Sequence, residues 1–189
     1  PIPRSRPRGV EVERELVLEG EAGRVAGSKS GSRAQGYLCE APCARGSVRV
    51  RSVGECAFLN INSVANGIAR DEYEYAIPLD DARRQLSTLA GDIVEKRRHY
   101  VNVDTHLYEI DEFKGVSQGL NVAELELDRV DAIFPRPSWM GREVSSLARY
   151  YNLNLALHPY SRWTEAERNG TDADRVYEDR TVVIRLPAK

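Results

Sequence analysis

The sequence predicts an α+β fold: an eight-stranded antiparallel β-barrel with helices packed against its outside. Three observations lead to it. Eight segments alternate apolar with charged or polar residues at a period of two, which is typical of β-strands. Most links between these segments have hairpin length, which favours antiparallel pairing of neighbours. Helical spacing is confined to a few segments, and closing the sheet would remove its exposed edges.

The expected strands cover residues 10–18, 35–39, 47–51, 57–62, 70–77, 93–103, 106–113 and 120–130. Residues 79–89 place leucines and an alanine at helical spacing and predict a helix with one apolar face. The pattern from 139 to 157 is helical but irregular, and residues 19–34, rich in Gly, Ser and Ala, predict a loop. We expect a flexible N-terminal arm (1–8), one barrel domain (9–163) and a polar C-terminal tail (164–189).

Composition sets bounds on partners and compartment. The chain has 189 residues and a formal net charge of -2, so its total charge predicts neither a nucleic-acid nor a membrane partner. It contains no stretch of about 18 apolar residues, so no transmembrane helix is expected. The three cysteines follow no zinc or redox spacing, and no secretory signal is found. We therefore expect a cytoplasmic protein with reduced thiols.

Charged residues of the expected strands come in pairs of one sign, two positions apart. These pairs are Glu11/Glu13, Arg49/Arg51, Glu72/Glu74, Lys96/Arg98, Glu109/Asp111 and Glu124/Glu126, and Glu15 extends the first. Residues two apart on a strand share a face. For any single pair a solvent-exposed face is the better explanation, but the repetition favours a shared, charged lumen. Carboxylates hold hard divalent cations, and arginine and lysine bind phosphate oxygens, so such a lumen suits a metal with a polyphosphate.

Several motifs occur in order between residues 9 and 163. The first strand reads Glu11-Val12-Glu13-Arg14-Glu15, followed by Gln35-Gly36-Tyr37-Leu38, Glu72-Tyr73-Glu74 and Glu95-Lys96-Arg97-Arg98. The series ends with Pro137-Ser138-Trp139-Met140-Gly141-Arg142-Glu143-Val144-Ser145. Together these motifs resemble the CYTH superfamily, also called triphosphate tunnel metalloenzymes, and in particular its short bacterial, inorganic triphosphatase-like members.

The resemblance implies a tunnel that binds a triphosphate, activation by Mg²⁺ or Mn²⁺, and hydrolysis of inorganic tripolyphosphate. It implies metal binding by Glu11, Glu13, Glu72, Glu74, Asp111, Glu124 and Glu126. It implies substrate binding by Arg49, Arg51, Lys96 and Arg98, with Lys96, Arg98, Glu11 and Glu13 as catalytic residues. The expected partner is a small-molecule triphosphate, and a homodimer is left open.

Two positions depart from the family pattern and keep alternatives open. Glu15 stands where the pattern E-x-E-x-K has a lysine, and Asn62 stands where a pattern like T-x-K has another. These replacements favour an alternative, a degenerate member that binds metal or phosphate-containing anions with little or no hydrolysis. A class IV adenylate cyclase is a third, less favoured interpretation. Basic residues of the 19–34 segment, Arg33 among them, are candidates to close over the tunnel and restore positive charge.

Overall fold

The computed structural model describes residues 12–19, 29–39, 46–63, 72–127, 129 and 131–171. Its strands are β1 (Val12–Leu18), β2 (Ser30–Cys39), β3 (Gly46–Val53), β4 (Cys56–Ser63), β5 (Glu72–Ile77), β6 (Ile93–Val103), β7 (His106–Phe113), β8 (Asn121–Leu127) and β9 (Met140–Glu143). Its helices are α1 (Leu79–Thr88), α2 (Asn152–Leu157) and α3 (Glu165–Asn169), with 3-10 turns η2 (Gly115–Ser117), η3 (Ala148–Tyr150) and η4 (Tyr160–Arg162).

These strands form one antiparallel sheet in the order β5-β4-β3-β2-β6-β7-β8-β1-β9. All eight predicted strands are present, so the prediction of an antiparallel sheet with a few helices is confirmed. The link between β3 and β4 is the two-residue turn Gly54–Glu55, where Gly54 has a φ of 57° that side-chain-bearing residues rarely adopt. Among the described strands no pairing joins the β5 edge to the β9 edge. Closure into a barrel therefore stays a prediction.

Two segments differ from the sequence prediction. The predicted loop 19–34 is wrong for residues 30–34, which form the first half of β2 and pair with β6 along their whole length, while Arg33 and Ala34 pair with β3 as well. Their Ser- and Gly-rich composition disfavours a strand, but pairing with neighbouring strands overrides that local preference. The predicted irregular helix from 139 is wrong for Met140–Glu143, which adds a ninth strand beside β1. This short strand covers the edge that β1 would otherwise expose.

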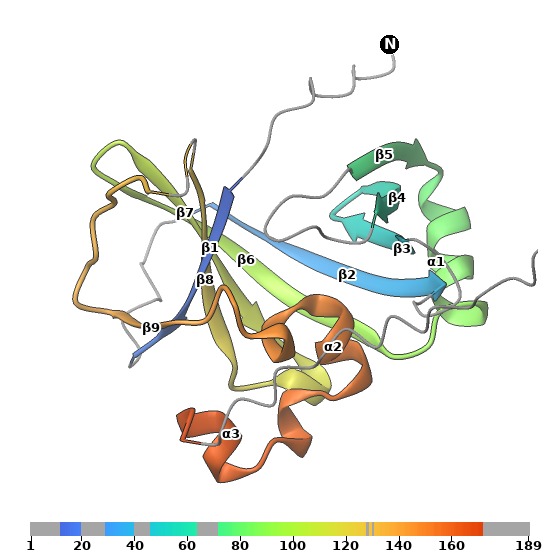
Figure 1. The fold of residues 1–189 in the computed structure, drawn as a ribbon. Helices are drawn as coiled ribbons and strands as arrows, with labels where there is room; N and C mark the ends of the chain where they lie inside the picture. Colours follow the sequence, from blue (N-terminus) through green and yellow to red (C-terminus); the bar gives the residue numbers. More distant parts are fainter. Residues whose placement is uncertain are drawn as a thin grey trace, which may run out of the picture.

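The sheet is strongly curved, as Figure 1 shows. Strands β5, β4 and β3 stand on one side, β7, β8 and β1 stand on the other, and β2 and β6 cross between them. We call the inner face the side of the sheet that carries Arg49, Lys96 and Asp111. The opposite side is the outer face.

Helix α1 packs on the outer face, across β2, β3 and β4. Its buried residues Ala82 and Leu86 join Val50 in one apolar cluster. Burying a leucine side chain contributes about 1.5–3 kcal/mol to stability. The close approach of this helix depends on Gly36, because a Cβ added there would lie 2.6 Å from the Cβ of Ala90.

Helix α2 instead covers one end of the inner face. Its buried Leu155 and Ala156 belong to an apolar cluster with Val94 and Phe113, which alternation places on the same face as Lys96 and Asp111. The prediction that helices lie outside the sheet is therefore correct for α1 and wrong for α2. Apolar packing closes this end of the inner face and leaves its middle to the charged residues.

The C-terminal segment predicted as a polar tail begins with helix α3. A capping box starts this helix: the hydroxyl of Thr164 accepts from the Glu167 N–H at 3.2 Å, and the Glu167 carboxylate accepts from the Thr164 N–H at 2.7 Å. Gly170, with a φ of 64°, ends it. Across the part of the chain that the structure describes, no helix combines the length and apolar character that a membrane crossing requires.

Candidate functional site

Strand pairing shows which charged side chains share the inner face. Residues directly opposite in an antiparallel pair lie on the same side of a sheet. From β6 to β1 the opposed pairs are Arg98↔Asp111, Tyr100↔Glu109, Glu109↔Glu124, Glu124↔Glu15 and Glu126↔Glu13. The predicted acidic and basic residues of these four strands therefore meet on one face.

The other half of the sheet continues this face. From β6 to β5 the opposed pairs are Lys96↔Arg33, Gln35↔Arg51, Tyr37↔Arg49, Arg49↔Asn60 and Asn60↔Glu74. Among the predicted site residues, Glu11 lies outside the described residues. Glu72 lies on β5 opposite Asn62, and the side chains of both fall outside the described part as well.

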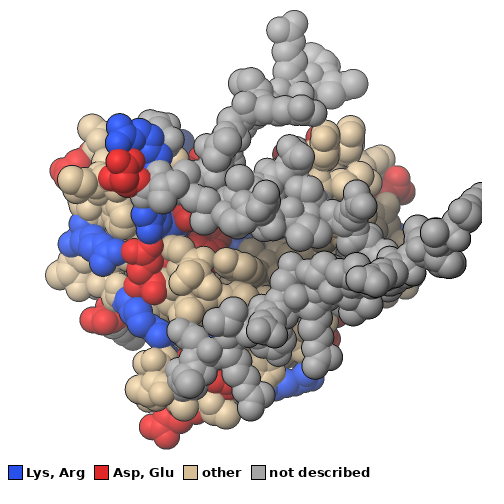
Figure 2. All heavy atoms as spheres, in the orientation of Figure 1, with Lys and Arg blue, Asp and Glu red and all other residues tan. Residues whose placement is uncertain are grey.

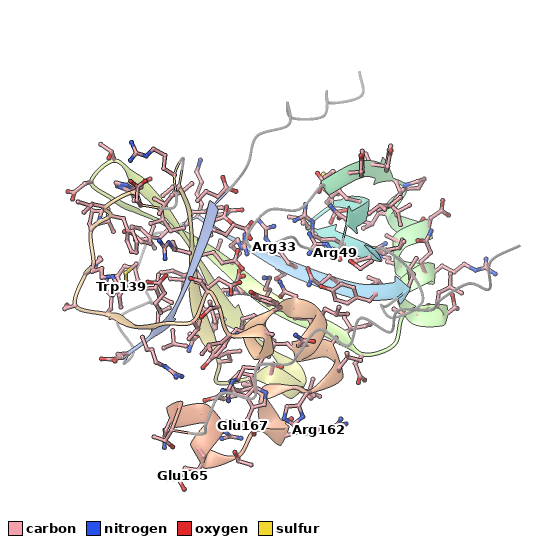
Figure 3. All side chains as sticks on the ribbon, in the orientation of Figure 1. Arg33, Arg49, Trp139, Arg162, Glu165 and Glu167 are labelled. Carbon is pink, nitrogen blue, oxygen red and sulfur yellow. The ribbon has the colours of Figure 1, made fainter. Side chains whose placement is uncertain are left out.

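Along the order of strands in the sheet, the inner face is basic in its centre and acidic toward both ends. The three neighbouring central strands, β3, β2 and β6, carry Arg49 and Arg51, Arg33, and Lys96 and Arg98. Strands β7, β8 and β1 carry Glu109 and Asp111, Glu124 and Glu126, and Glu13 and Glu15, while β5 carries Glu74. Figure 3 shows Arg33 and Arg49 between the two sides of the curved sheet. The curvature thus turns acidic strands toward a basic centre.

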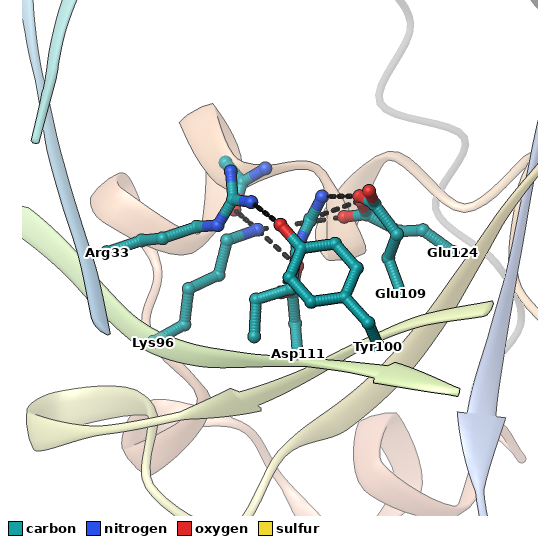
Figure 4. A network of polar contacts seen from close by, with 8 residues as sticks. Arg33, Lys96, Tyr100, Glu109, Asp111 and Glu124 are labelled. Carbon is teal, nitrogen blue, oxygen red and sulfur yellow. Dashed lines mark hydrogen bonds and ion pairs between the residues drawn. The ribbon is translucent and has the colours of Figure 1, made fainter. Parts of the chain in front are cut away.

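Asp111 holds the two basic residues of β6 that lie on the inner face. Its side chain is fully buried. Lys96 Nζ donates to its Oδ2, and Arg98 donates from Nε to Oδ1 and from Nη2 to Oδ2, both at 2.6 Å (Figure 4). Burial raises the pKa of Asp111, but Lys96 and Arg98 outweigh burial and hold that pKa well below its usual range. Asp111 is therefore ionised and fixes both cations in place.

Arg98 also joins two acidic strands. It donates through Nη1 to Glu109 and through Nη2 to Glu124. Burial lowers the pKa of Arg98, but Glu124 and Asp111 raise it by more than burial lowers it. The net shift is upward, so the guanidinium keeps its charge. For Glu124, burial and the neighbouring Asp111 carboxylate raise the pKa, although Lys96 Nζ lies 3.6 Å from Oε1. Glu124 is thus easier to protonate than an ordinary glutamate.

A second ion pair lies at the β5 end of the inner face. Arg51 donates to Oε2 of Glu74, and Asn60 Nδ2 donates to the same oxygen at 2.9 Å. Asn60 is fully buried between these strands. The predicted substrate residue Arg51 and the predicted metal ligand Glu74 are therefore bound to each other.

Three inner-face residues were not among the predicted site residues. Arg33 on β2 donates to the hydroxyl of Tyr100 on β6, and Asn152, the first residue of α2, accepts from Lys96 Nζ at 3.3 Å. The sequence indicates Arg33 only as a base of a loop that closes over the tunnel, whereas the structure places it on β2, opposite Lys96. Asn152 follows no sequence period, because its place depends on how α2 packs.

The carboxylates provide a donor set that suits a hard divalent cation, since all its ligands are oxygens. Glu13 opposes Glu126, and Glu15 opposes Glu124, and like charges in such positions destabilise a sheet unless a cation lies between them. Within the described residues, no three His, Cys, Asp or Glu side chains converge as a metal site. Mg²⁺ commonly uses one or two carboxylates together with substrate phosphates and water, so the residues fit a metal that binds with its substrate.

The exterior shows a different charge pattern. On the face seen in Figure 2, acidic and basic side chains of the described residues alternate at one side, beside a larger area of other residues. Exposed pairs of opposite charge, such as Arg129 and Asp131, also occur among the described residues. Sorting of charge by strand is thus a property of the inner face.

A protein-family comparison decides the identity of this arrangement. The model described as "CYTH domain" matches residues 36–156, a span that includes β3 to β8, all the named inner-face bases except Arg33, and most of the inner-face acids. The chain belongs to the CYTH family. A curated relative, the inorganic triphosphatase of Acetivibrio thermocellus, is 36% identical over 158 residues, which are 83% of this chain and 99% of that protein.

Solved structures of CYTH-like proteins agree with this assignment. The crystal structure of the inorganic triphosphatase NE1496 aligns with a TM-score of 0.61 and 29% identity, covering 80% of this chain and 97% of that one. A second structure of NE1496 aligns with a TM-score of 0.59 and 30% identity, covering 78% and 97%. This CYTH chain therefore shares its fold with an inorganic triphosphatase over nearly that protein's full length.

Proposed function

We propose that this protein hydrolyses inorganic tripolyphosphate, or a related triphosphate compound, along the inner face with Mg²⁺ or Mn²⁺ as activator. The observation that carries the proposal is the order of charge across the sheet. Three neighbouring basic strands have the acidic strands β7, β8 and β1 on one side and, beyond β4, the acidic strand β5 on the other. A relative with 36% identity over 158 residues named "Inorganic triphosphatase" supports the reaction class.

The basic strands provide the binding surface for the phosphate chain. Neighbouring strands lie about 4.8 Å apart, so β3 and β6, with β2 between them, lie about 10 Å apart. Their long basic side chains can therefore contact different phosphoryl groups of one phosphate chain. Arg49, Lys96 and Arg98 are each less than a tenth exposed, and charged hydrogen bonds to phosphate are stronger where water is excluded. In the proposal, Arg49, Arg51, Lys96 and Arg98 hold the substrate.

The acidic strands would hold the metal. Glu13, Glu124 and Glu126 come from the neighbouring strands β1 and β8 and face the same side. The remaining proposed ligands are Glu11, Glu72, Glu74 and Asp111. A bound divalent ion neutralises phosphate charge and activates or orients the attacking water.

In this proposal, the protein's own side chains stabilise the transition state and accept the proton of the attacking water. Asp111 keeps Lys96 and Arg98 charged and at fixed positions, so they can stabilise the charge of a loose phosphoryl-transfer transition state without rearranging. The raised pKa of Glu124 makes this carboxylate a suitable acceptor for a proton from the attacking water. Glu11 and Glu13 remain the other proposed catalytic acids.

A second candidate, anion binding with little or no turnover, is favoured by specific contacts. Glu15 adds a third acid to the row Glu109, Glu124, Glu15 across three strands. Arg98 is already engaged by three carboxylates. A phosphate group must compete with these acids for Arg98, which would weaken both binding and hydrolysis.

Phosphate release from tripolyphosphate in Mg²⁺ or Mn²⁺ tests the proposal. We expect turnover by the wild type, a loss of at least about a hundredfold for Lys96→Gln, and an unchanged rate for Arg97→Gln. Arg97 makes a matched control because it adjoins Lys96 on β6 but is exposed on the outer face. An inert wild type that still binds tripolyphosphate would favour the second candidate, and cyclic AMP formation from ATP would identify a cyclase.

A further inference from the structure

Arg33 lies in the middle of the basic surface. Its strand, β2, is hydrogen-bonded to β3 on one side and β6 on the other. Lys96 is directly opposite Arg33 on β6, and Arg51 lies on the facing strand β3. Arg33 therefore fills the gap between the two pairs of bases that the sequence indicates.

Arg33 differs from its basic neighbours in having no acid partner within the described part of the chain. Lys96 and Arg98 bind Asp111, and Arg51 binds Glu74. For Arg33 the structure shows one contact, the hydrogen bond from Nη2 to the hydroxyl of Tyr100 (Figure 4). Its Nε is buried and has no hydrogen-bond acceptor among the described residues. Most of this guanidinium's hydrogen-bonding capacity is thus left for an anion.

Room for an anion exists beside this guanidinium. Gly31, two residues earlier on β2, lies opposite Arg98. A Cβ added to Gly31 would meet no atom within 4 Å. The inner face is therefore open between Arg33 and Arg98, and Tyr100 is bonded to Arg33 from the β6 side of this opening.

We propose that Arg33 is a phosphate-binding residue that links the bases of β3 to those of β6, and that Tyr100 is the positioning residue that holds it. The proposal rests on the proposed function, because it concerns the same inner face, and it adds a residue that the sequence motifs do not indicate. Two family lysines are replaced here by Glu15 and Asn62. Arg33 returns one positive charge to the centre of the face.

Binding of tripolyphosphate in EDTA, measured by calorimetry, tests Arg33 without metal-dependent turnover. One lost charged hydrogen-bonding group predicts an increase in Kd of about tenfold to a hundredfold for Arg33→Gln. Arg33→Lys should recover part of the affinity, because it keeps the charge. Arg97→Gln, which removes one positive charge from the outer face, should change Kd by less than about twofold.

Tyr100→Phe separates a positioning role from simple packing. We expect a Kd increase of about threefold in the wild-type background and no further increase in the Arg33→Gln background, since the hydroxyl acts through Arg33. Equal effects of Tyr100→Phe in both backgrounds would contradict its role. Equal Kd values for Arg33→Gln and Arg97→Gln would overturn the role of Arg33.

The binding result also separates this inference from the proposed function. If Kd follows these expectations while no variant releases phosphate, Arg33 binds phosphate and the proposal of hydrolysis is wrong. If phosphate is released, but Arg33→Gln binds and turns over tripolyphosphate as Arg97→Gln does, then the proposal of hydrolysis stands and the role of Arg33 is wrong. A wild type that binds no tripolyphosphate, with or without metal, would contradict both.

Discussion

Replacement of Asp111 by asparagine should destabilise the protein more than any other isosteric change on the inner face. Asp111 is fully buried, and its carboxylate accepts hydrogen bonds from both Lys96 and Arg98. Asp111→Asn keeps the shape of the side chain but removes the one fully buried anion that both cations bind, leaving them only the partly exposed Glu109 and Glu124. Breaking such a buried pair from one side costs about 3–5 kcal/mol, a large part of the 5–15 kcal/mol typical of a domain.

A matched control lies on the exterior. Arg129 also donates to both carboxylate oxygens of Asp131, at 2.9 and 2.5 Å, but both side chains are 72% exposed. Because water screens this pair, Asp131→Asn should leave the free energy of unfolding nearly unchanged. Denaturant unfolding of the two variants at pH 7 compares the same bidentate geometry in two environments.

The pH dependence supplies a second check on Asp111. The folded state lowers its pKa, so its contribution to stability is fully present above the unfolded value of about 3.9 and is lost as pH falls through the lower folded value. The stability difference between wild type and Asp111→Asn should therefore narrow below about pH 4. A drop for Asp111→Asn at pH 7 no larger than that for Asp131→Asn would refute the reasoning.

Three further predictions follow from the inner face and from the packing of α1 on the outer face. Glu15 and Glu124 are opposed like charges, and Glu15→Lys turns them into an opposite-charge pair. The free energy of unfolding should therefore rise by about 0.2–1 kcal/mol, and calorimetry should show tighter binding of tripolyphosphate. A lower free energy of unfolding together with weaker binding would contradict this. Gly36→Ala should cost about 1–3 kcal/mol in denaturant unfolding because its Cβ meets Ala90, whereas Gly31→Ala on the same strand should cost much less; equal costs would show that this packing is unimportant. In a chelator, Glu124→Gln should be more stable than wild type at pH 7, because a raised folded pKa means that ionisation of this glutamate opposes folding; its advantage should disappear near pH 4, and a less stable variant at pH 7 would contradict the raised pKa.

The face on which each charged residue lies could be predicted from the sequence. Lys96 and Arg98 alternate with exposed Glu95 and Arg97 along β6, and this period of two fixes the side of the sheet whatever the strand order is. The same reasoning places Glu124 and Glu126 on the inner face. Period alone does not give register, so the binding of Arg98 to acids on β7 and β8 could not be predicted.

The errors of prediction lie where tertiary structure overrides local preference. Arg33 belongs to Ser30-Gly31-Ser32-Arg33-Ala34, which lacks the β-branched and aromatic residues typical of strands. These residues are strand because β6 pairs with all five, and β3 pairs with Arg33 and Ala34. Asn152 reaches Lys96 because α2 packs on the inner face, and neither the direction of that helix nor the ninth strand has a periodic signal.

A crystal structure of the protein with tripolyphosphate and Mn²⁺ would test the central claim most directly, since anomalous scattering locates the manganese. We expect phosphoryl groups over β3, β2 and β6, within hydrogen-bonding distance of Arg49, Arg33 and Lys96. We expect manganese between the phosphate chain and the carboxylates of Glu124 and Glu126. Tripolyphosphate bound on the outer face, or manganese bound away from all the proposed carboxylate ligands, would contradict the account.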